Sequence, residues 1–312
     1  MLSAIQVRAA GGRRHAAAPV GPDQVTDPAA SSEAYFRAAS ATLALRAGSS
    51  EPDMSAALLE RLYGVTGSVA TLSSEIERTV AVDLPDGRRM ILKTSTRSEA
   101  VDSFRFQAAA IAGLRGAAGF VAPEVIPTSS GALVFEHEGV CGYLQTRLEG
   151  IAVHQAQLTP DLLFRTGSAL ARLDLALDRV SPPATDRPIL WHIGCWPRLM
   201  EFAQYLPSAP VAEQVGVAMA EYVEFVEPHI SNVAWQVTHN DPSPFNMMVT
   251  GQGMGFIDFG DGCWSPRIQD LAIAASHIVK DPTLPLGGPN NLLQAMPLSF
   301  HFRRWKRDCS WD

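Results

Sequence analysis

The sequence predicts an α+β fold with two lobes, in which a small antiparallel sheet precedes a larger and mainly helical lobe. Short apolar runs separated by turn residues dominate the chain from Met54 to Leu148, as expected of antiparallel strands. From Thr159 onward, apolar residues recur at helical spacing. A length of 312 residues with 46% hydrophobic composition supplies enough apolar surface for the core of such a chain.

Composition and charge narrow the classes of partner. The formal net charge of −7 argues against a nucleic-acid binder, which shows a basic patch, and is compatible with a small cationic ligand. No apolar run approaches the length of a membrane span. The four cysteines show no CxxC pairing and are interpreted as reduced thiols, without zinc or a disulfide framework. The oligomeric state stays open.

The first 53 residues differ from the rest of the chain. They are rich in Ala, Gly, Ser and Arg and lack sustained periodicity, so we expect a disordered extension with one short helix over 34–45. Three arginines precede the first acidic residue, Asp23, which is the composition of an organellar transit peptide. A mitochondrial location is therefore the alternative to a cytoplasmic one. An unstructured extension, or a true start at Met54, is the interpretation we favour.

The small lobe is expected over 54–149. Ser55 can cap a short helix that ends at Gly64. Three strands are expected over 69–72, 79–84 and 90–94. Lys93 lies inside the apolar third strand and needs an anionic partner, because burying an unpaired ammonium group is very costly.

The rest of the small lobe is expected to hold one helix and two more strands. A capping box of Thr96 and Glu99 begins the helix. The strands are expected over 132–136 and 143–148, and Glu149-Gly150 is the expected hinge between the lobes.

The second lobe is expected over 150–280. Thr159 caps a helix with Pro160 in its first turn, and two further helices are expected over 195–205 and 211–226.

A polar loop and a hairpin near the end of this lobe bring three oxygen-bearing side chains together. An apolar strand over 233–237 leads into a loop that holds Asp241 and Asn246. A hairpin turned by Thr250-Gly251-Gln252-Gly253 carries Asp258 back beside Asn246. A carboxylate and an amide carbonyl suit a hard cation such as Mg²⁺, which leaves Asp241 free to accept a proton.

These residues resemble the aminoglycoside phosphotransferase and choline kinase family, which shares the protein-kinase fold. That family usually has His-Gly-Asp, four residues and Asn, followed by Ile-Asp-Phe-Gly-Asp. This chain has His239-Asn240-Asp241, then Asn246, then Ile257-Asp258-Phe259-Gly260-Asp261. The resemblance implies ATP and Mg²⁺ as cofactors, Asp241 as the base, and Asn246 and Asp258 as metal ligands. It also implies that Lys93 contacts the ATP phosphates.

Three further segments resemble hydroxylysine kinase and phosphotransferase domains fused to aminotransferases: Leu62-Tyr63-Gly64, Ser73-Ser74-Glu75 and Ile189-Leu190-Trp191. In place of a Gly-rich loop, the hydroxyl groups of Ser73 and Ser74 and nearby backbone N–H groups are expected to hold phosphate oxygens. The main chain of Thr146, Arg147 and Leu148, at the crossing between the lobes, is expected to bind adenine.

The charge partner of Lys93 departs from the family pattern. A Glu of the small-lobe helix pairs with this Lys in kinase-like folds, but the matching position here is Gln107. Gln107 can accept a hydrogen bond from Lys93 without supplying charge, and Glu99 is the alternative partner. His239 is expected to be structural, and Asp270 resembles the family's Asp that braces the catalytic loop.

The expected acceptor is the hydroxyl group of a small amine-bearing metabolite, hydroxylysine-like first and choline-like second. Asp261, Trp191 and Trp264 are the candidate substrate residues, because a carboxylate and aromatic faces hold ammonium groups. Two alternatives stay open: a non-catalytic nucleotide-binding protein of the same fold, and a phosphotransferase that confers aminoglycoside resistance. The resemblance ends near Lys280, so the tail 281–312 is expected to be divergent or truncated.

Overall fold

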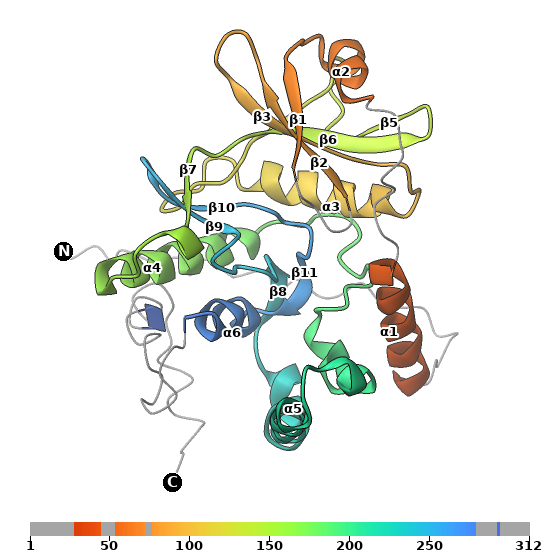
Figure 1. Cartoon of the computed structure of the whole chain (residues 1–312), viewed down its shortest axis with the longest axis vertical. Helices are drawn as coiled ribbons and strands as arrows, with labels where there is room; N and C mark the ends of the chain where they lie inside the picture. Colours follow the sequence, from red (N-terminus) through yellow and green to blue (C-terminus); the bar gives the residue numbers. More distant parts are fainter. Residues whose placement is uncertain (1–27, 45–53, 73–76, 279–291, 294–312) are drawn as a thin grey trace, which may run out of the picture.

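The computed structural model describes residues 28–44, 54–72, 77–278 and 292–293. They form a small lobe of antiparallel strands and a larger lobe that holds most of the helices (Figure 1). The predicted two-lobed α+β fold is confirmed. Ser73, Ser74 and nearly all of the predicted tail over 281–312 lie outside the described residues. No helix in the described segments has the length and apolar character needed to cross a membrane.

Six antiparallel strands form the sheet of the small lobe, in the order β1-β2-β3-β6-β4, with β5 also paired to β6. Their bounds are β1 Ser68–Leu72, β2 Arg78–Asp83, β3 Arg89–Ser95, β4 Val125–Ile126, β5 Phe135–His137 and β6 Val140–Thr146. The first three agree with the predicted strands to within one residue at each end. Glu138 and Gly139 both adopt positive φ and form a two-residue hairpin turn, so β6 begins at Val140, earlier than the predicted strand over 143–148. The two-residue strand β4 was not predicted.

Two helices belong to the small lobe. Helix α2 (Ser55–Leu58) continues as the π-helical turn η1 (Leu59–Tyr63), which the left-handed Gly64 ends. Helix α3 spans Ala100–Gly113, and its capping residue Glu99 makes no side-chain cap hydrogen bond. The predicted capping box at Thr96 is therefore wrong: β3 extends to Ser95, whose hydroxyl accepts a hydrogen bond from the backbone N–H of Arg97.

The segment that crosses into the second lobe was predicted as a hinge at Glu149-Gly150, and it also begins a strand. Residues Gly150–Ala152 form β7, which joins the hairpin strands β9 (Met247–Thr250) and β10 (Gly253–Phe256) in the order β10-β9-β7. Gly150 has a φ of 156°, and a Cβ atom there would come within 2.3 Å of the carbonyl oxygen of Val249. Glycine at this position lets the crossing segment lie directly against the hairpin that ends at the predicted metal site.

The second lobe combines helices with a short two-stranded sheet, β11-β8. Its remaining elements are η2 Val153–Gln155, α4 Pro160–Leu177, η3 Ile193–Tyr205, α5 Ala209–Glu221, η4 Tyr222–Val226, η5 Glu227–Asn232, β8 Trp235–Thr238, β11 Cys263–Pro266 and α6 Ile268–Ser276. Thr159 caps α4 as predicted, since its hydroxyl accepts a hydrogen bond from the N–H of Leu162 at 3.1 Å. The helix predicted over 195–205 is a 3₁₀ helix, with Pro197 inside it.

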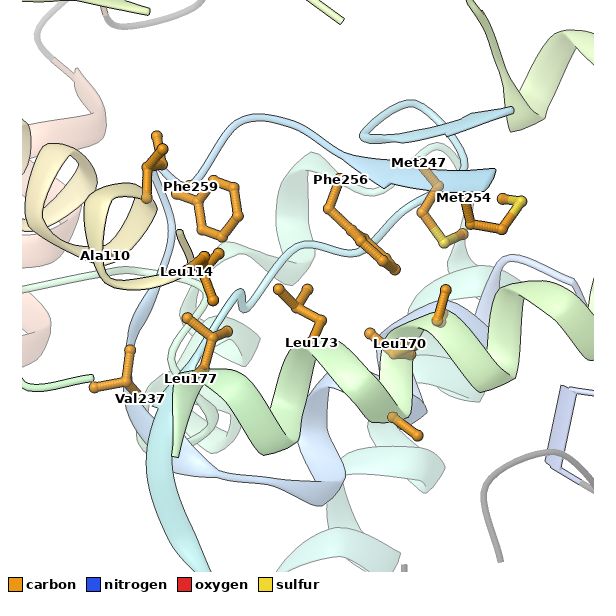
Figure 2. Close-up of a cluster of buried hydrophobic side chains, with 14 of the residues drawn as sticks. Ala110, Leu114, Leu170, Leu173, Leu177, Val237, Met247, Met254, Phe256 and Phe259 are labelled. Carbon is orange, nitrogen blue, oxygen red and sulfur yellow. The ribbon is translucent and has the colours of Figure 1, made fainter. Parts of the chain in front are cut away.

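The apolar stripe of α4 forms the centre of the larger core. Figure 2 shows Leu170, Leu173 and Leu177 of α4 facing side chains from the hairpin and from α3. The labelled partners are Ala110, Leu114, Val237, Met247, Met254, Phe256 and Phe259. Burying a large apolar side chain contributes roughly 1.5–3 kcal/mol. The contacts of α4 therefore fix the hairpin, and with it the ends of the loops that carry the polar site.

Part of the predicted N-terminal extension is a packed helix. Helix α1 spans Pro28–Ala44, so the helix expected over 34–45 is present but begins earlier. Phe36 and Ala39 are buried against Leu190 and Cys195 of the second lobe. In Figure 1, α1 lies on the side of the molecule opposite to β7.

Candidate active site

A cleft of about 1680 Å³ lies between the two lobes. Nine of the predicted site residues line it: Lys93, Thr146, Arg147, Leu148, Trp191, Asp241, Asn246, Asp258 and Asp261. Two do not. Gln107 is fully buried behind the cleft lining, and Trp264 is half-exposed elsewhere on the surface.

Lys93 is buried at the floor of the cleft and has two carboxylate partners. Its Nζ atom lies 2.7 Å from Oδ1 of Asp258 and 3.2 Å from Oε2 of Glu77. Burial opposes the charge, but the two carboxylates outweigh it and hold the pKa of Lys93 well above its ordinary value. The same Lys93 charge is the main reason that the pKa of Asp258 lies below its usual range. Lys93 is therefore charged and Asp258 is ionised at neutral pH.

The hydrogen bond predicted between Gln107 and Lys93 is present, although Gln107 lies outside the cleft lining. Its Oε1 accepts hydrogen bonds from Lys93 at 3.1 Å and from the hydroxyl of Tyr143 at 2.9 Å. Its Nε2 donates to Oε1 of Glu77 at 2.7 Å. Gln107 thus lies behind Lys93 and orients both Lys93 and the carboxylate that pairs with it.

The charged partner that the small lobe supplies to Lys93 is Glu77, and not the predicted alternative Glu99. Glu77 was not among the predicted site residues. It lies just before β2, and β2 pairs with β3 so that Thr79 faces Lys93. Side chains two residues apart in a strand share a face, so position 77 lies on the side of Thr79 and beside the end of Lys93. This alternation was the available signal.

The loop that carries Asp241 is held by two buried groups. The carboxylate of Asp270 accepts hydrogen bonds from the backbone N–H groups of His239 at 2.8 Å and Asn240 at 2.7 Å. His239 bonds through Nε2 to the carbonyl of Ile257 at 3.0 Å, and its Nδ1 accepts from the N–H of Asp241 at 3.3 Å. Burial lowers the pKa of His239, so the imidazole is neutral and ties the loop to the segment before Asp258.

Asp241 and Asn246 are in direct contact. The Nδ2 atom of Asn246 donates to Oδ2 of Asp241 at 2.6 Å and to its carbonyl at 3.1 Å. Burial, together with the charge of Asp258, raises the pKa of Asp241. A half-buried carboxylate with a raised pKa, open to a cleft, is suited to accept a proton.

Two residues of the site adopt backbone conformations that L side chains rarely take. Asn240 has a φ of 62° and Asp258 a φ of 61°. In the family pattern the position of Asn240 is usually Gly, which adopts positive φ without strain, and Asn tolerates it better than most other residues. Backbone strain of this kind clusters at functional sites.

The side chains of Asn246 and Asp258 fit a divalent cation. Because Asn246 donates through Nδ2 to Asp241, its amide oxygen is directed elsewhere and is available as a ligand. About half of the Asp258 side chain (51%) is exposed to the cleft. Among the described residues no group of three His, Cys, Asp or Glu side chains is arranged to hold a metal ion by itself. One carboxylate and one amide match Mg²⁺, which commonly completes its coordination with water and substrate phosphates.

The segment that crosses between the two lobes also lines the cleft. Thr146 bonds through its N–H to the carbonyl of Glu124 at 2.9 Å, and Arg147 through its N–H to the carbonyl of Arg89 at 2.9 Å. These bonds fix the main chain of the segment that was predicted to bind adenine. Leu148 follows in the lining.

The other end of the cleft carries a second group of polar residues. Asp186, Trp191 and Asp261 line it. Burial and the charges of Asp258 and Asp241 raise the pKa of Asp261 to about 7. Arg187 donates to the carbonyl of Gly260 at 2.8 Å and lies over the ring of Phe106 at 3.9 Å from its centroid. Sequence reasoning missed Asp186 and Arg187, which stand beside the Ile189-Leu190-Trp191 segment that it singled out.

Trp264 does not join this group. It lies on β11 between Cys263 and Ser265, which are both buried. Alternate residues of a strand point to opposite faces, so Trp264 points outward. The geometry does not support a role for Trp264 in holding the substrate.

The fold and the cleft define a phosphotransferase with a kinase-like architecture. Residues 68–290 match the phosphotransferase enzyme family, and the chain belongs to that family. A hydroxylysine kinase from Danio rerio is 27% identical over 255 residues, covering 74% of this chain and 72% of the relative. Together with the solved kinases described next, these matches identify the chain as a small-molecule kinase.

Solved structures share the fold at low sequence identity. A microcompartment-associated aminopropanol kinase has a TM-score of 0.57 with 19% identity, covering 80% of each chain. An amicoumacin kinase in complex with AMP-PNP and Ca²⁺ has a TM-score of 0.58 with 13% identity, covering 84% of this chain and 79% of the other. A spectinomycin phosphotransferase in complex with ADP and spectinomycin has a TM-score of 0.54 with 12% identity, covering 80% of each chain.

Proposed function

We propose that the protein transfers the γ-phosphoryl group of ATP, in a Mg²⁺-dependent reaction, to the hydroxyl group of a small amine-bearing metabolite. The observation that carries the proposal is the arrangement of Asp241 and Asn246 in the same cleft as the Lys93–Asp258 pair. Phosphoryl transfer requires positioning and charge neutralisation more than covalent chemistry. This set of residues supplies both.

Asp241 is proposed to accept the proton of the attacking hydroxyl group. The hydrogen bond from Asn246 fixes the direction of its carboxylate, and the bonds from Asp270 fix its loop. Its raised pKa strengthens it as a base relative to an exposed Asp.

Lys93, Asn246 and Asp258 are proposed to hold the nucleotide. Lys93 is charged and supplies a fixed cation for phosphate oxygens. Asn246 and Asp258 would hold Mg²⁺, which, when bound, neutralises charge on the phosphates. The nucleotide complexes of the solved amicoumacin kinase and spectinomycin phosphotransferase are consistent with this use of the fold.

An amine-bearing acceptor is favoured by the charges at the other end of the cleft. The carboxylates of Asp186 and Asp261 and the exposed ring of Trp191 are groups that hold ammonium ions. Without a bound cation, the pKa of Asp261 lies at about 7. A nearby ammonium group would lower that pKa and so favour the ionised carboxylate. The names of two relatives, hydroxylysine kinase and aminopropanol kinase, also denote amino alcohols.

The test is a competition between matched acceptors at limiting ATP, followed by phosphorus NMR. Hydroxylysine, 1-amino-2-propanol and choline are offered together with neutral alcohols of the same carbon skeleton, and an aminoglycoside is included as a separate arm. Preferential phosphorylation of the amines, lost in the Asp186→Asn variant, supports the proposal. Preference for a neutral alcohol overturns the amine acceptor. ATP binding without transfer to any acceptor favours a non-catalytic nucleotide-binding protein, and transfer only to the aminoglycoside favours a resistance phosphotransferase.

A further inference from the structure

Helix α1 lies outside the 68–290 segment that matches the family, yet it is attached to the second lobe by a dense set of contacts. Its buried face packs Phe36 and Ala39 against Leu190 and Cys195, with Leu199 alongside. Apolar burial of this kind holds the helix in a defined position rather than as a loose extension.

Polar contacts tie the same helix to the segment that lines the end of the cleft. The hydroxyl of Tyr35 donates to the carbonyl of Arg187 at 3.1 Å and accepts from the N–H of Ile189 at 3.0 Å. Glu33 forms an ion pair with Arg198. Because the Arg187 side chain bonds to the carbonyl of Gly260, α1 is linked through one residue to the loop that follows Asp258.

Two small residues of α1, Ala38 and Thr42, line the cleft itself. The Thr42 hydroxyl donates to the Ala38 carbonyl at 3.0 Å, so this surface presents mainly methyl groups. Trp191 and Trp196 line the cleft near it. Figure 1 shows α1 and the crossing strand β7 on opposite sides of the molecule. The part of the cleft lining that Ala38 and Thr42 contribute is therefore distant from the segment proposed to bind adenine.

We propose that α1 forms one wall of the acceptor site and sets the size of acceptor that the enzyme takes. The methyl surface of Ala38 and Thr42 contacts the aliphatic part of the acceptor, while Asp186 and Asp261 face its amine. This inference rests on the proposed function, since it names the part of the cleft in which the amine-bearing alcohol lies. Ala38 and Thr42 are specificity-determining residues, and Tyr35 is a positioning residue that acts through Arg187.

The test is a graded series at Ala38, with Val, Leu and Phe in turn, in the full-length protein. Ala41 is the matched control, because it is exposed on the same helix and does not line the cleft. Binding of hydroxylysine and of the shorter 1-amino-2-propanol is measured by calorimetry in the presence of AMP-PNP and Mg²⁺, and thermal unfolding shows that each variant is folded. ATP affinity is measured alongside.

The expected result is a stepwise loss of hydroxylysine affinity, at least about 10-fold for Ala38→Phe, with a smaller loss for the shorter amine. ATP affinity stays unchanged, and Ala41→Phe behaves as the unmodified protein. If the Ala38 variants bind both amines as tightly as the unmodified protein does, α1 does not form a wall of the acceptor site. The proposed function is unaffected by that result. A failure of the unmodified protein to bind either amine overturns both.

Discussion

The carboxylate of Glu77 lies 3.2 Å from the ammonium group of Lys93, and Gln107 donates a hydrogen bond to that same carboxylate. In kinase-like folds the carboxylate paired with this Lys comes from the small-lobe helix. Here the helix supplies an amide, and the negative charge comes from the segment before β2. When Asp258 binds Mg²⁺, as proposed, Glu77 remains the carboxylate that holds Lys93 toward the phosphates.

We therefore predict that Glu77→Gln lowers kcat/KM for ATP by about 10- to 100-fold, since the lysine loses the partner that positions it. Steady-state kinetics with varied ATP measures the effect. Glu99→Gln is the control, because Glu99 also lines the cleft but the ion pairs of Lys93 are with Glu77 and Asp258. A Glu77→Gln enzyme with unchanged kinetics would show that the pair has no role in nucleotide use.

Exchanging the two side chains gives a sharper prediction. Gln107→Glu alone should lower activity, because it places a carboxylate where Nε2 now donates to Glu77 at 2.7 Å. The double variant Glu77→Gln with Gln107→Glu restores one amide and one carboxylate, so it should recover most of the kcat/KM lost by Glu77→Gln. If the losses in kcat/KM from the two single substitutions simply add in the double variant, Glu77 and Gln107 do not act together on Lys93.

The first three small-lobe strands could be predicted from the sequence, because alternating apolar residues and a Gly-containing turn encode them locally. The same holds for the hairpin between Asn246 and Asp258. Glu77 could not be recognised as readily, since its role depends on a strand register that places Thr79 opposite Lys93. The capping box at Thr96 failed for a related reason: a local motif competed with the extension of β3 by pairing with β6.

Asn240 provides a prediction about backbone strain. Its φ of 62° suits Gly, so Asn240→Gly should retain activity within a few-fold. Asn240→Val should be destabilised by about 1–3 kcal/mol and should lose turnover, because a β-branched residue resists this conformation and displaces the neighbouring Asp241. Unfolding midpoints and kcat are measured on both variants.

A matched control exists in the small lobe. Glu138 has a φ of 50° in the exposed turn between β5 and β6. Glu138→Val should lower stability in the same way while leaving kcat unchanged. If Asn240→Val keeps normal turnover, the strain at Asn240 does not serve to position Asp241.

The brace beneath the catalytic loop predicts a pH dependence of stability. Asp174 and Asp270 are both fully buried, and burial raises the pKa of Asp174 well above its usual range and that of Asp270 to about 6. The folded state therefore binds more protons than the unfolded chain between about pH 4 and pH 6, and the contribution of this pair to stability falls as pH rises. The two carboxyl groups face each other, so a proton held between them stabilises the pair. Asp174→Asn replaces that proton with an amide N–H that donates to Asp270.

We expect Asp174→Asn to gain stability relative to the unmodified protein as pH rises from 4 to 7, by roughly 1–3 kcal/mol at the upper end. Urea unfolding across this range measures the difference. Asp161→Asn is the control on the same helix, because Asp161 is exposed and forms a surface ion pair with Arg165. If the difference in unfolding free energy between Asp174→Asn and the unmodified protein does not change with pH, the two carboxyl groups do not share a proton.

The acceptor end of the cleft was harder to predict than the nucleotide end. Trp191 and Trp264 were equally good candidates by residue type, but only the structure shows that Trp191 lines the cleft while Trp264 points outward from β11. Helix α1 gave a weak signal because its apolar residues pack on Leu190 and Cys195, which are distant in sequence. Only Phe36 and Ala39 are buried in this contact, which is too few for a sustained periodic pattern.

The most direct test of the account compares Asp241→Asn with Asp258→Ala in two assays, calorimetric ATP binding with Mg²⁺ and single-turnover phosphoryl transfer to the preferred amine. We predict that Asp241→Asn binds ATP normally and loses transfer by about 10²–10⁴-fold, as expected for a general base. Asp258→Ala should lose Mg²⁺-dependent ATP binding, as expected for a metal ligand. Equal loss of ATP affinity in both variants, or normal transfer by Asp241→Asn, would contradict the proposed division of roles in this site.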